Sequence, residues 1–313
     1  MLEKIAVIGA GNVGATTVQR LAEAELARVV SMVDIAEGVP QGKALDILES
    51  GPVYGYDTRV LGSNDYDIVE GANIVVITAG LPRKPGMTRD DLLEANGRIM
   101  TGVCQQVKRV APDSIVIVVS NPLDVMCHVA KDVTGFPRHR VIGMAGVLDS
   151  ARFRTFIAEA LDVSVEDVHA FVLGGHGDTM VPLVNYSTVA GIPLPKLMDE
   201  TTLNALVQRT RDGGAEIVKY LKTGSAFYAP SASVVAMVES IVKDKKRILP
   251  CSALLQGEYG VQDLYVGVPC KLGKNGLEQV LEIELSEAER QMLNISVEDV
   301  RSNVQKLQQL ALV

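Results

Sequence analysis

His176 is the residue whose setting most strongly indicates chemistry. It lies in the run Gly-Gly-His-Gly-Asp at 174–178, directly after an apolar stretch that is typical of a strand. Glycine on both sides leaves the imidazole accessible and lets a ligand approach the backbone. Because an imidazole exchanges a proton near neutral pH, this run predicts a functional histidine. The other three, His128, His139 and His169, lack such a setting, and we expect them to be structural.

Asp149 and Arg152 form a second candidate pair. They open a helix that is predicted from about Asp149 to Leu161, and their i, i+3 spacing places both on one face. The pattern has two interpretations, an ion pair that only supports the helix, or a carboxylate and a guanidinium held ready for a ligand.

Residues 79–89 form a basic loop. Two prolines and two glycines in this stretch exclude a helix. Arg83, Lys84 and Arg89 place three cations within seven residues of an otherwise acidic chain. The loop follows an apolar strand predicted at 73–78, and ligands bind at the carboxyl ends of parallel strands. We therefore expect a ligand-binding loop, with a solvated basic turn as the alternative.

Residues 4–34 are predicted to form a strand, a glycine turn, a helix and a second strand that is followed by an acidic residue. Gly9 permits a tight turn, Gly11 lets the backbone approach a pyrophosphate, and Gly14 allows close packing of helix and strand. The pyrophosphate would lie on the free N–H groups at the helix N-terminus. Asp34 is placed to accept hydrogen bonds from a ribose diol and would repel a 2′-phosphate, so the sequence predicts NAD rather than NADP.

The elements that position these residues alternate between strands and helices, which is typical of βαβ units in a parallel sheet. We predict an α/β fold, a Rossmann doubly wound parallel sheet in residues 1–145 followed by a C-terminal α+β substrate domain in 146–313. The antiparallel strands predicted at 247–255 and 265–272 belong to the second domain. A long helix predicted at 202–221 contains Gly213-Gly214, which close packing or a bend would explain.

A strand predicted at 114–119 ends in Ser120-Asn121-Pro122. Pro122 directs the backbone away from the sheet and leaves Asn121 at the strand tip. The Asn121 amide would bind a ligand there, or alternatively cap the next helix.

Composition bounds the function classes. The 313 residues are 47% hydrophobic and 22% charged, which is typical of a globular protein, and the net charge of −8 argues against nucleic acid as the main partner. The first residues show no signal peptide, and no apolar run is long enough to span a membrane. The four cysteines lack metal-ligand spacing, so we expect no metal site and buried thiols in a reducing compartment.

Taken together, the motifs resemble the lactate/malate dehydrogenase superfamily, and within it the lactate-dehydrogenase-like malate dehydrogenases of bacteria. The resemblance runs from about Lys4 to the C-terminus. Its carriers are the glycine run at 9–14, Leu-Pro-Arg-Lys-Pro-Gly-Met-Thr-Arg at 81–89, Ser-Asn-Pro-Leu-Asp at 120–124, Gly-Val-Leu-Asp-Ser-Ala-Arg at 146–152 and the histidine run at 174–178.

The resemblance implies a role for each candidate residue. His176 is the acid/base and Asp149 orients it, while Arg152 binds the substrate carboxylate and Arg89, on a closing loop, polarises the reacting oxygen. Asn121 bonds that oxygen or the nicotinamide side. The cofactor is NAD, and the residues that the resemblance assigns to it are Gly9, Ala10, Gly11, Asn12, Val13, Gly14, Asp34, Asn96, Val119, Ser120 and Asn121.

The type of residue at position 83 indicates which substrate is used. Lactate dehydrogenases usually have Gln where Arg83 stands, and Thr where Ala226 stands by alignment through residues 224–228. Both departures favour a dicarboxylate, malate or oxaloacetate, over lactate.

Other interpretations are a lactate dehydrogenase, an NAD-using glycoside hydrolase with a Cys–His metal site, a methyltransferase that binds S-adenosylmethionine, and a catalytically silent structural protein. The resemblance also implies a homo-oligomer, dimer or tetramer, in the cytoplasm.

Overall fold

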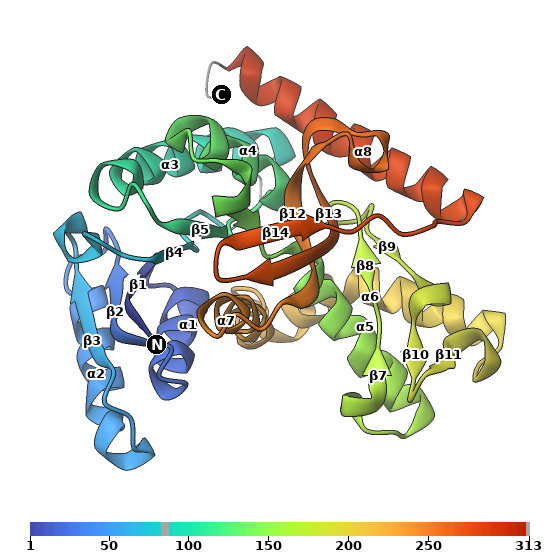
Figure 1. Cartoon of the computed structure of the whole chain (residues 1–313), viewed down its shortest axis with the longest axis horizontal. Helices are drawn as coiled ribbons and strands as arrows, with labels where there is room; N and C mark the ends of the chain where they lie inside the picture. Colours follow the sequence, from blue (N-terminus) through green and yellow to red (C-terminus); the bar gives the residue numbers. More distant parts are fainter. Residues whose placement is uncertain (83–87, 311–313) are drawn as a thin grey trace.

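The computed structural model describes residues 1–82 and 88–310. In this described part, one central sheet has nine strands in the order β14-β13-β12-β6-β5-β4-β1-β2-β3 (Figure 1). The six strands of the N-terminal half are mutually parallel, as predicted. They are β1 (Leu2–Ile8), β2 (Ala27–Val33), β3 (Arg59–Ser63), β4 (Ile74–Ile77), β5 (Ile115–Val118) and β6 (Val141–Gly143).

Helices cover both faces of the parallel strands. The helices α3 and α4 lie together on one face, while α1 packs against α7 on the other (Figure 1). Residues of β4 and β5 are all buried, because strands with helices on both faces must be apolar throughout. The helices of this half are α1 (Asn12–Glu23), α2 (Val39–Tyr54), α3 (Arg89–Val110) and α4 (Leu123–Thr134).

The C-terminal half continues the same sheet. The strand β12 pairs with β6 in antiparallel register, with Ser252 opposite Gly143, and then with β13. The predicted boundary between residues 145 and 146 lies at the start of α5, directly after β6. Because β12 pairs with β6 across this boundary, the two halves share one sheet. The central strands here are β12 (Arg247–Gln256), β13 (Gln262–Gly273) and β14 (Gly276–Val280). The helices are α5 (Ala145–Leu161), α6 (Glu200–Leu221), α7 (Tyr228–Val242) and α8 (Glu287–Gln309).

Short strands complete this half in two small sheets, β11-β10-β7 and β8-β9. The single strand expected at 169–173 is therefore divided between them. Side chains of α5 form hydrogen bonds with the backbone on either side of the break. Arg154 Nε donates to the carbonyl of Val168, and the N–H of Val172 donates to Ser150 Oγ. The strands are β7 (Val168–His169), β8 (Val172–Leu173), β9 (Val181–Pro182), β10 (Thr188–Val189) and β11 (Ile192–Pro193).

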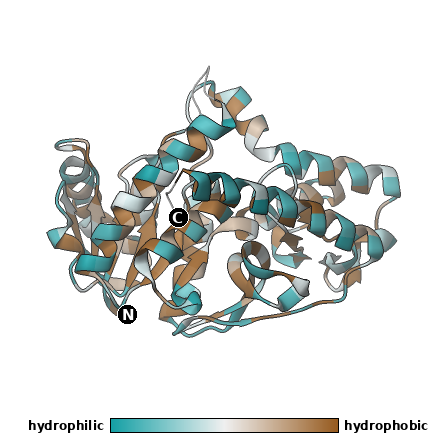
Figure 2. Ribbon diagram, turned by 90° about the horizontal axis from the view of Figure 1, so that it is seen from above, coloured by the Kyte–Doolittle hydropathy of each residue, from teal (hydrophilic) through white to brown (hydrophobic). Residues whose placement is uncertain are grey.

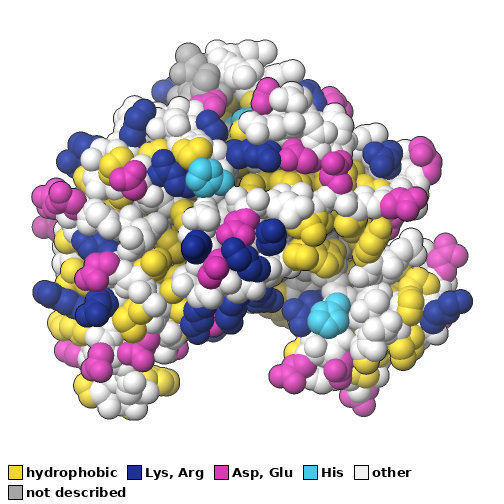
Figure 3. Space-filling model, viewed as in Figure 1, with side chains coloured by type: hydrophobic (Ala, Val, Ile, Leu, Met, Phe, Trp, Pro, Cys, Tyr) yellow, Lys and Arg dark blue, Asp and Glu magenta, His cyan; other side chains and the backbone are white. Residues whose placement is uncertain are grey.

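Hydrophobic residues concentrate on the central strands, between the helices (Figure 2). All four cysteines are buried free thiols, as expected. On the face shown in Figure 3, Lys and Arg side chains are interspersed with Asp and Glu. Among the described residues, no helix combines the length and apolar character needed to cross a membrane.

His128 of α4 is part of this core. Its side chain is buried, and Nε2 accepts a hydrogen bond of 3.1 Å from the main-chain N–H of Tyr265, whose ring packs edge-on against the imidazole. Burial lowers the pKa of His128 to about 4. Above about pH 4, the folded protein therefore contains the neutral imidazole.

This lowered pKa predicts a pH-dependent stability. Between pH 6.5 and 4 the unfolded chain binds a proton at His128 that the folded chain does not, so stability falls as the pH falls through this window. When the pH is lowered from 7 to 5, protonation of His128 in the unfolded chain should reduce the free energy of unfolding by about 2 kcal/mol. Urea unfolding of the wild type and of His128→Gln, at equal protein concentration, measures the difference. An equal loss in both proteins would contradict the prediction.

Candidate active site

The histidine run lies at the end of β8. Gly174 has a φ of +81°, and its main chain is paired with Gly267 of β13 through N···O distances of 2.8 and 3.2 Å. A side chain at Gly174 would lie 2.8 Å from Ser296 Oγ. The glycines therefore let the loop pack closely as well as turn. The His176 side chain is 14% exposed, so it is more enclosed than the flanking glycines suggest.

Asp149 connects His176 to Arg152. His176 Nδ1 donates to Asp149 Oδ2 over 2.8 Å, and Arg152 Nη1 donates to Asp149 Oδ1 over 3.2 Å. The Asp149 side chain is only 2% exposed. The i, i+3 pair is thus real, but it is part of a three-residue chain rather than an isolated support of α5. The three side chains predicted from separate motifs lie together.

The surroundings determine the protonation of His176. Burial alone lowers the pKa of the imidazole, but the charge of Asp149 and its hydrogen bond outweigh this effect, and the net pKa is raised. Arg152 opposes the rise and Asp124 adds to it. Since Asp149 accepts the proton on Nδ1, Nε2 is the nitrogen that remains for proton exchange.

Arg152 is held by α6. A side chain at Gly213 would lie 2.9 Å from Arg152 Cδ, and one at Gly214 would lie 3.6 Å from Nη2. Close packing on Arg152 therefore explains the glycine at 213, whereas the distance at Gly214 is an ordinary van der Waals contact. Arg152 Nε is buried and has no hydrogen-bond partner within residues 1–82 and 88–310. A carboxylate placed beside it would satisfy this donor.

Arg89 begins α3 and reaches the histidine loop. Its Nη2 donates to Asp178 Oδ2 over 2.7 Å, in an ion pair whose side chains are 76% and 80% exposed. Thr88 caps the helix, and Asp91 completes a capping box with it. Arg83 and Lys84 lie outside the described residues.

Asn96, which is 2% exposed, contacts both of the loops that follow β4 and β5. Its amide oxygen accepts from the N–H of Leu81 over 2.8 Å, and its amide nitrogen donates to the carbonyl of Asn121 over 2.7 Å. Ser120 Oγ donates to the carbonyl of Ala79. The helix cap of α4 is Pro122, so the alternative in which Asn121 caps this helix is wrong.

The glycine turn fits a dinucleotide. Gly9 has a φ of +109°, and a side chain at Gly14 would lie 1.9 Å from the Gly9 carbonyl oxygen. In the described part, nothing lies within 4 Å of a side chain built at Gly11, and no side chain caps α1 there. Open space and free N–H groups at a helix start are what a pyrophosphate requires. Asp34 directly follows β2, and its Oδ2 accepts from the N–H of Ala10 over 2.6 Å.

Two acidic residues near His176 were not assigned a role from the sequence. Asp124 follows Asn121 in the same motif and accepts the main-chain N–H of His176 over 2.9 Å, while Asp178 pairs with Arg89. Both stand inside motifs, which is a usable signal. An acid in the first turn of a helix, however, is equally typical of simple dipole stabilisation.

The arrangement joins three functions. A buried His–Asp pair can move a proton, an arginine beside it can bind a carboxylate, and the glycine turn can hold a dinucleotide. In the described residues there is no group of three or more His, Cys, Asp or Glu that could hold a metal ion.

Comparison with known proteins identifies two family regions. The region described as "lactate/malate dehydrogenase, NAD binding domain" matches residues 3–143, and "lactate/malate dehydrogenase, alpha/beta C-terminal domain" matches residues 146–311. A malate dehydrogenase from Chloroherpeton thalassium is 60% identical over 304 residues, which cover 97% of this chain and 98% of that protein.

Solved structures of both activities are similar. The malate dehydrogenase of Salinibacter ruber has a TM-score of 0.95 at 54% identity over 98% of each chain. A lactate dehydrogenase of Cryptosporidium parvum, complexed with lactic acid and nicotinamide adenine dinucleotide, has a TM-score of 0.95 at 43% identity, also over 98% of each chain. The chain therefore belongs to the lactate/malate dehydrogenase family.

Proposed function

We propose that this chain is an NAD-dependent malate dehydrogenase that interconverts (S)-malate and oxaloacetate. The observation that carries the chemistry is the shared carboxylate of Asp149, which holds His176 at 2.8 Å and Arg152 at 3.2 Å. High identity to malate dehydrogenases over nearly the whole chain supports the choice of substrate.

The proposed mechanism assigns proton transfer to His176. In malate oxidation, Nε2 accepts the hydroxyl proton while Nδ1 remains hydrogen-bonded to Asp149, whose charge stabilises the imidazolium. In oxaloacetate reduction, Nε2 returns the proton. When bound, NAD supplies the hydride acceptor, and NADH supplies the hydride donor.

Two arginines and an amide orient the substrate in this proposal. Arg152 offers a planar fork to the carboxylate next to the reacting carbon, because its Nε has no partner among the described residues and α6 packs against its stem. Arg89 stabilises the negative charge that develops on the carbonyl oxygen. Asn121 hydrogen-bonds the same oxygen or the nicotinamide side of the site.

The cofactor residues follow the strand tips. The N–H groups at the start of α1 bind the pyrophosphate and Asp34 binds the adenosine ribose. Asn96 contacts the cofactor in this proposal, and its amide also connects the loops after β4 and β5. The full proposed set is Gly9, Ala10, Gly11, Asn12, Val13, Gly14, Asp34, Asn96, Val119, Ser120 and Asn121.

The proposal divides the work between the halves of the chain. Residues 1–145 bind NAD and residues 146–313 carry the acid/base pair. We place the enzyme in the cytoplasm and in the tricarboxylic acid cycle, since its four thiols are free and its substrate is a small dicarboxylate. The alternative activity, an L-lactate or other 2-hydroxy acid dehydrogenase, differs at the substrate's far end.

Arg83 distinguishes malate from lactate in this proposal. Its guanidinium pairs with the second carboxylate of oxaloacetate, whereas the methyl group of pyruvate would leave that charge unpaired. An unpaired buried charge costs several kcal/mol, and each 1.4 kcal/mol is about a tenfold change in rate.

Replacing Arg83 should invert the preference. In Arg83→Gln, kcat/KM should fall for oxaloacetate and rise for pyruvate, and the ratio of the two should change about a thousandfold. NADH oxidation assays with both keto acids measure the ratio. The matched control is Lys84→Gln, which removes the neighbouring cation and should leave the ratio near the wild-type value. A ratio that does not move in Arg83→Gln would refute the assignment.

The raised pKa of His176 predicts opposite pH profiles for the two directions. Oxaloacetate reduction requires the imidazolium, so kcat/KM should fall as the pH rises through a pKa above 6.5. Malate oxidation requires the neutral ring and should rise through the same pKa. Asp149→Asn removes the charge that raises the pKa, so both transitions should move to lower pH. Wild-type transitions below pH 6.5 would be inconsistent with this assignment.

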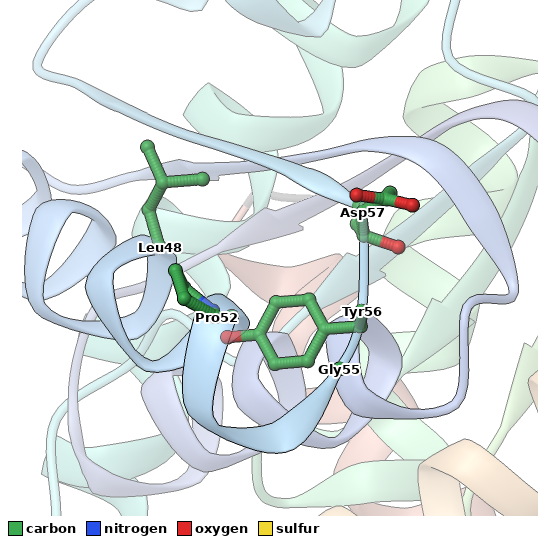
Figure 4. A pocket seen from close by; sticks show the side chains of 7 residues that line it. Leu48, Pro52, Gly55, Tyr56 and Asp57 are labelled. Atoms are coloured by element: carbon green, nitrogen blue, oxygen red, sulfur yellow. The ribbon is translucent and has the colours of Figure 1, made fainter.

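We also propose a homotetramer that uses the outer surface of α2. Leu45, Leu48 and Pro52 share one helical face, and Val53 and Tyr54 are 85% and 68% exposed. Beside them lies a hollow of about 630 Å³, with Leu48 and Pro52 on one side and Tyr56 and Asp57 on the other (Figure 4). The seven residues that line it all lie between 48 and 58 and include none of the proposed site residues. We define Leu45, Leu48, Pro52, Val53 and Tyr54 as the α2 surface.

Charging this surface should divide the assembly. The double variant Leu45→Glu/Leu48→Glu should give dimers or monomers, because two carboxylates would be buried without partners at the contact. Light scattering coupled to size exclusion measures the mass. As a control, Gln105→Glu adds a charge on an exposed position of α3 and should remain tetrameric. An unchanged mass of the double variant would exclude the α2 surface as a contact.

A further inference from the structure

A buried carboxyl group lies behind the catalytic histidine and is not used in the proton transfer described above. Asp124, in the first turn of α4, is 4% exposed. Its Oδ2 accepts the main-chain N–H of His176 over 2.9 Å, and its Oδ1 accepts Ser252 Oγ–H over 2.6 Å. We propose that Asp124, supported by Ser252, is a positioning residue that fixes the main chain of His176 relative to the strand tip at Asn121.

The contacts cross between the two halves of the chain. Asp124 belongs to the helix that directly follows Asn121, whereas His176 and Ser252 belong to the C-terminal half. One carboxyl therefore accepts two hydrogen bonds that connect α4 to the C-terminal half, one from the acid/base loop at His176 and one from β12 at Ser252. Such a connection keeps the imidazole aligned with the substrate oxygen when both loops carry ligand.

The neighbouring residues leave room for this connection. Ser252 lies opposite Gly143 in the pairing of β12 with β6. A side chain at Gly143 would lie 2.8 Å from Ser252 Cβ and 2.6 Å from Cys127 Sγ. The absence of a side chain at Gly143 thus allows Ser252 to approach Asp124.

A second side chain holds the same loop. Ser296 of α8 accepts the main-chain N–H of Gly175 over 2.6 Å, so two consecutive N–H groups are bound by side chains from α8 and α4. A side chain at Gly175 would lie 3.3 Å from Ser296 Oγ and 3.5 Å from Asp124 Oδ2. His176 is therefore held at two points, its main-chain nitrogen at Asp124 and its Nδ1 at Asp149.

The chemistry of the contact predicts which substitution is tolerated. Burial raises the pKa of Asp124, and the hydrogen bonds from Ser252 and from the His176 main chain oppose that rise. An asparagine keeps an oxygen for the His176 N–H and an amide that can donate to Ser252 Oγ. Alanine leaves both partners without a hydrogen bond. A positioning role thus requires the hydrogen bonds and not the carboxylate as such.

This inference rests on the proposed malate dehydrogenase activity, and the experiment separates the two. Asp124→Ala should lower kcat for oxaloacetate reduction about 100-fold, as a small misplacement of an acid/base group does. KM for oxaloacetate and the NADH dissociation constant should stay within about threefold, because Arg152 and the glycine turn are unchanged. Asp124→Asn should keep kcat within about threefold of the wild type, and Ser252→Ala should give an intermediate loss.

The control is Thr134→Val on the same helix, which removes a buried hydroxyl whose hydrogen bonds, among the residues that the structure describes, are to the local backbone of Ala130 and Phe136. It should lower the melting temperature without lowering kcat. Wild-type kcat in Asp124→Ala, or an equal loss in Asp124→Asn and Asp124→Ala, would overturn the inference. If Asp124→Ala does not fold, an undiminished kcat in Ser252→Ala overturns it instead. A wild-type enzyme inactive on oxaloacetate would refute the proposed function itself.

Discussion

The buried carboxylate of Asp149 is the interaction on which the site depends. It is 2% exposed and divides its two oxygens between His176 and Arg152. A buried charge is stable only when it is paired and hydrogen-bonded, so both partners must be present for α5 to hold this residue inside. The requirement explains the surroundings, since α6 needs glycine at 213 to let Arg152 reach its position.

The shared sheet gives this carboxylate a fixed relation to the cofactor side. Because β12 pairs with β6, the strands that end near the glycine turn and those that support the histidine loop form one continuous framework. Gly174 joins the loop to β13, and Asp124 joins it to α4. Proton transfer and hydride transfer must occur at adjacent atoms, so a site between halves needs this rigidity.

Residue patterns predicted what depends on local geometry, and the family resemblance supplied the pairing of His176 with Asp149, but the contacts of Asp124 were not predicted. The glycine turn, the parallel strands and the Asp149–Arg152 spacing are local patterns, and the structure has each of them. The contact of His176 with Asp124 spans 52 residues, and that of Asp124 with Ser252 spans 128. These contacts follow from the pairing of β12 with β6, which apolar patterns do not encode. Likewise, the helix predicted after the glycine turn ends at Glu23, and Glu25 takes a φ of +47° before β2.

Substrate choice is separate from the fold. A malate dehydrogenase and a lactate dehydrogenase both align to this chain with a TM-score of 0.95, so the scaffold is the same for a dicarboxylate and a monocarboxylate. In the proposed function, the acid/base pair and Arg152 act on the part that both substrates share, a carboxylate next to the reacting carbon. Discrimination must therefore come from the group that meets the other end of the substrate. A guanidinium there makes the missing carboxylate of pyruvate an electrostatic cost, whereas a neutral amide does not. In the proposed function, one side chain in the loop thus selects the substrate, and the His176–Asp149 pair carries out the proton transfer that both activities share.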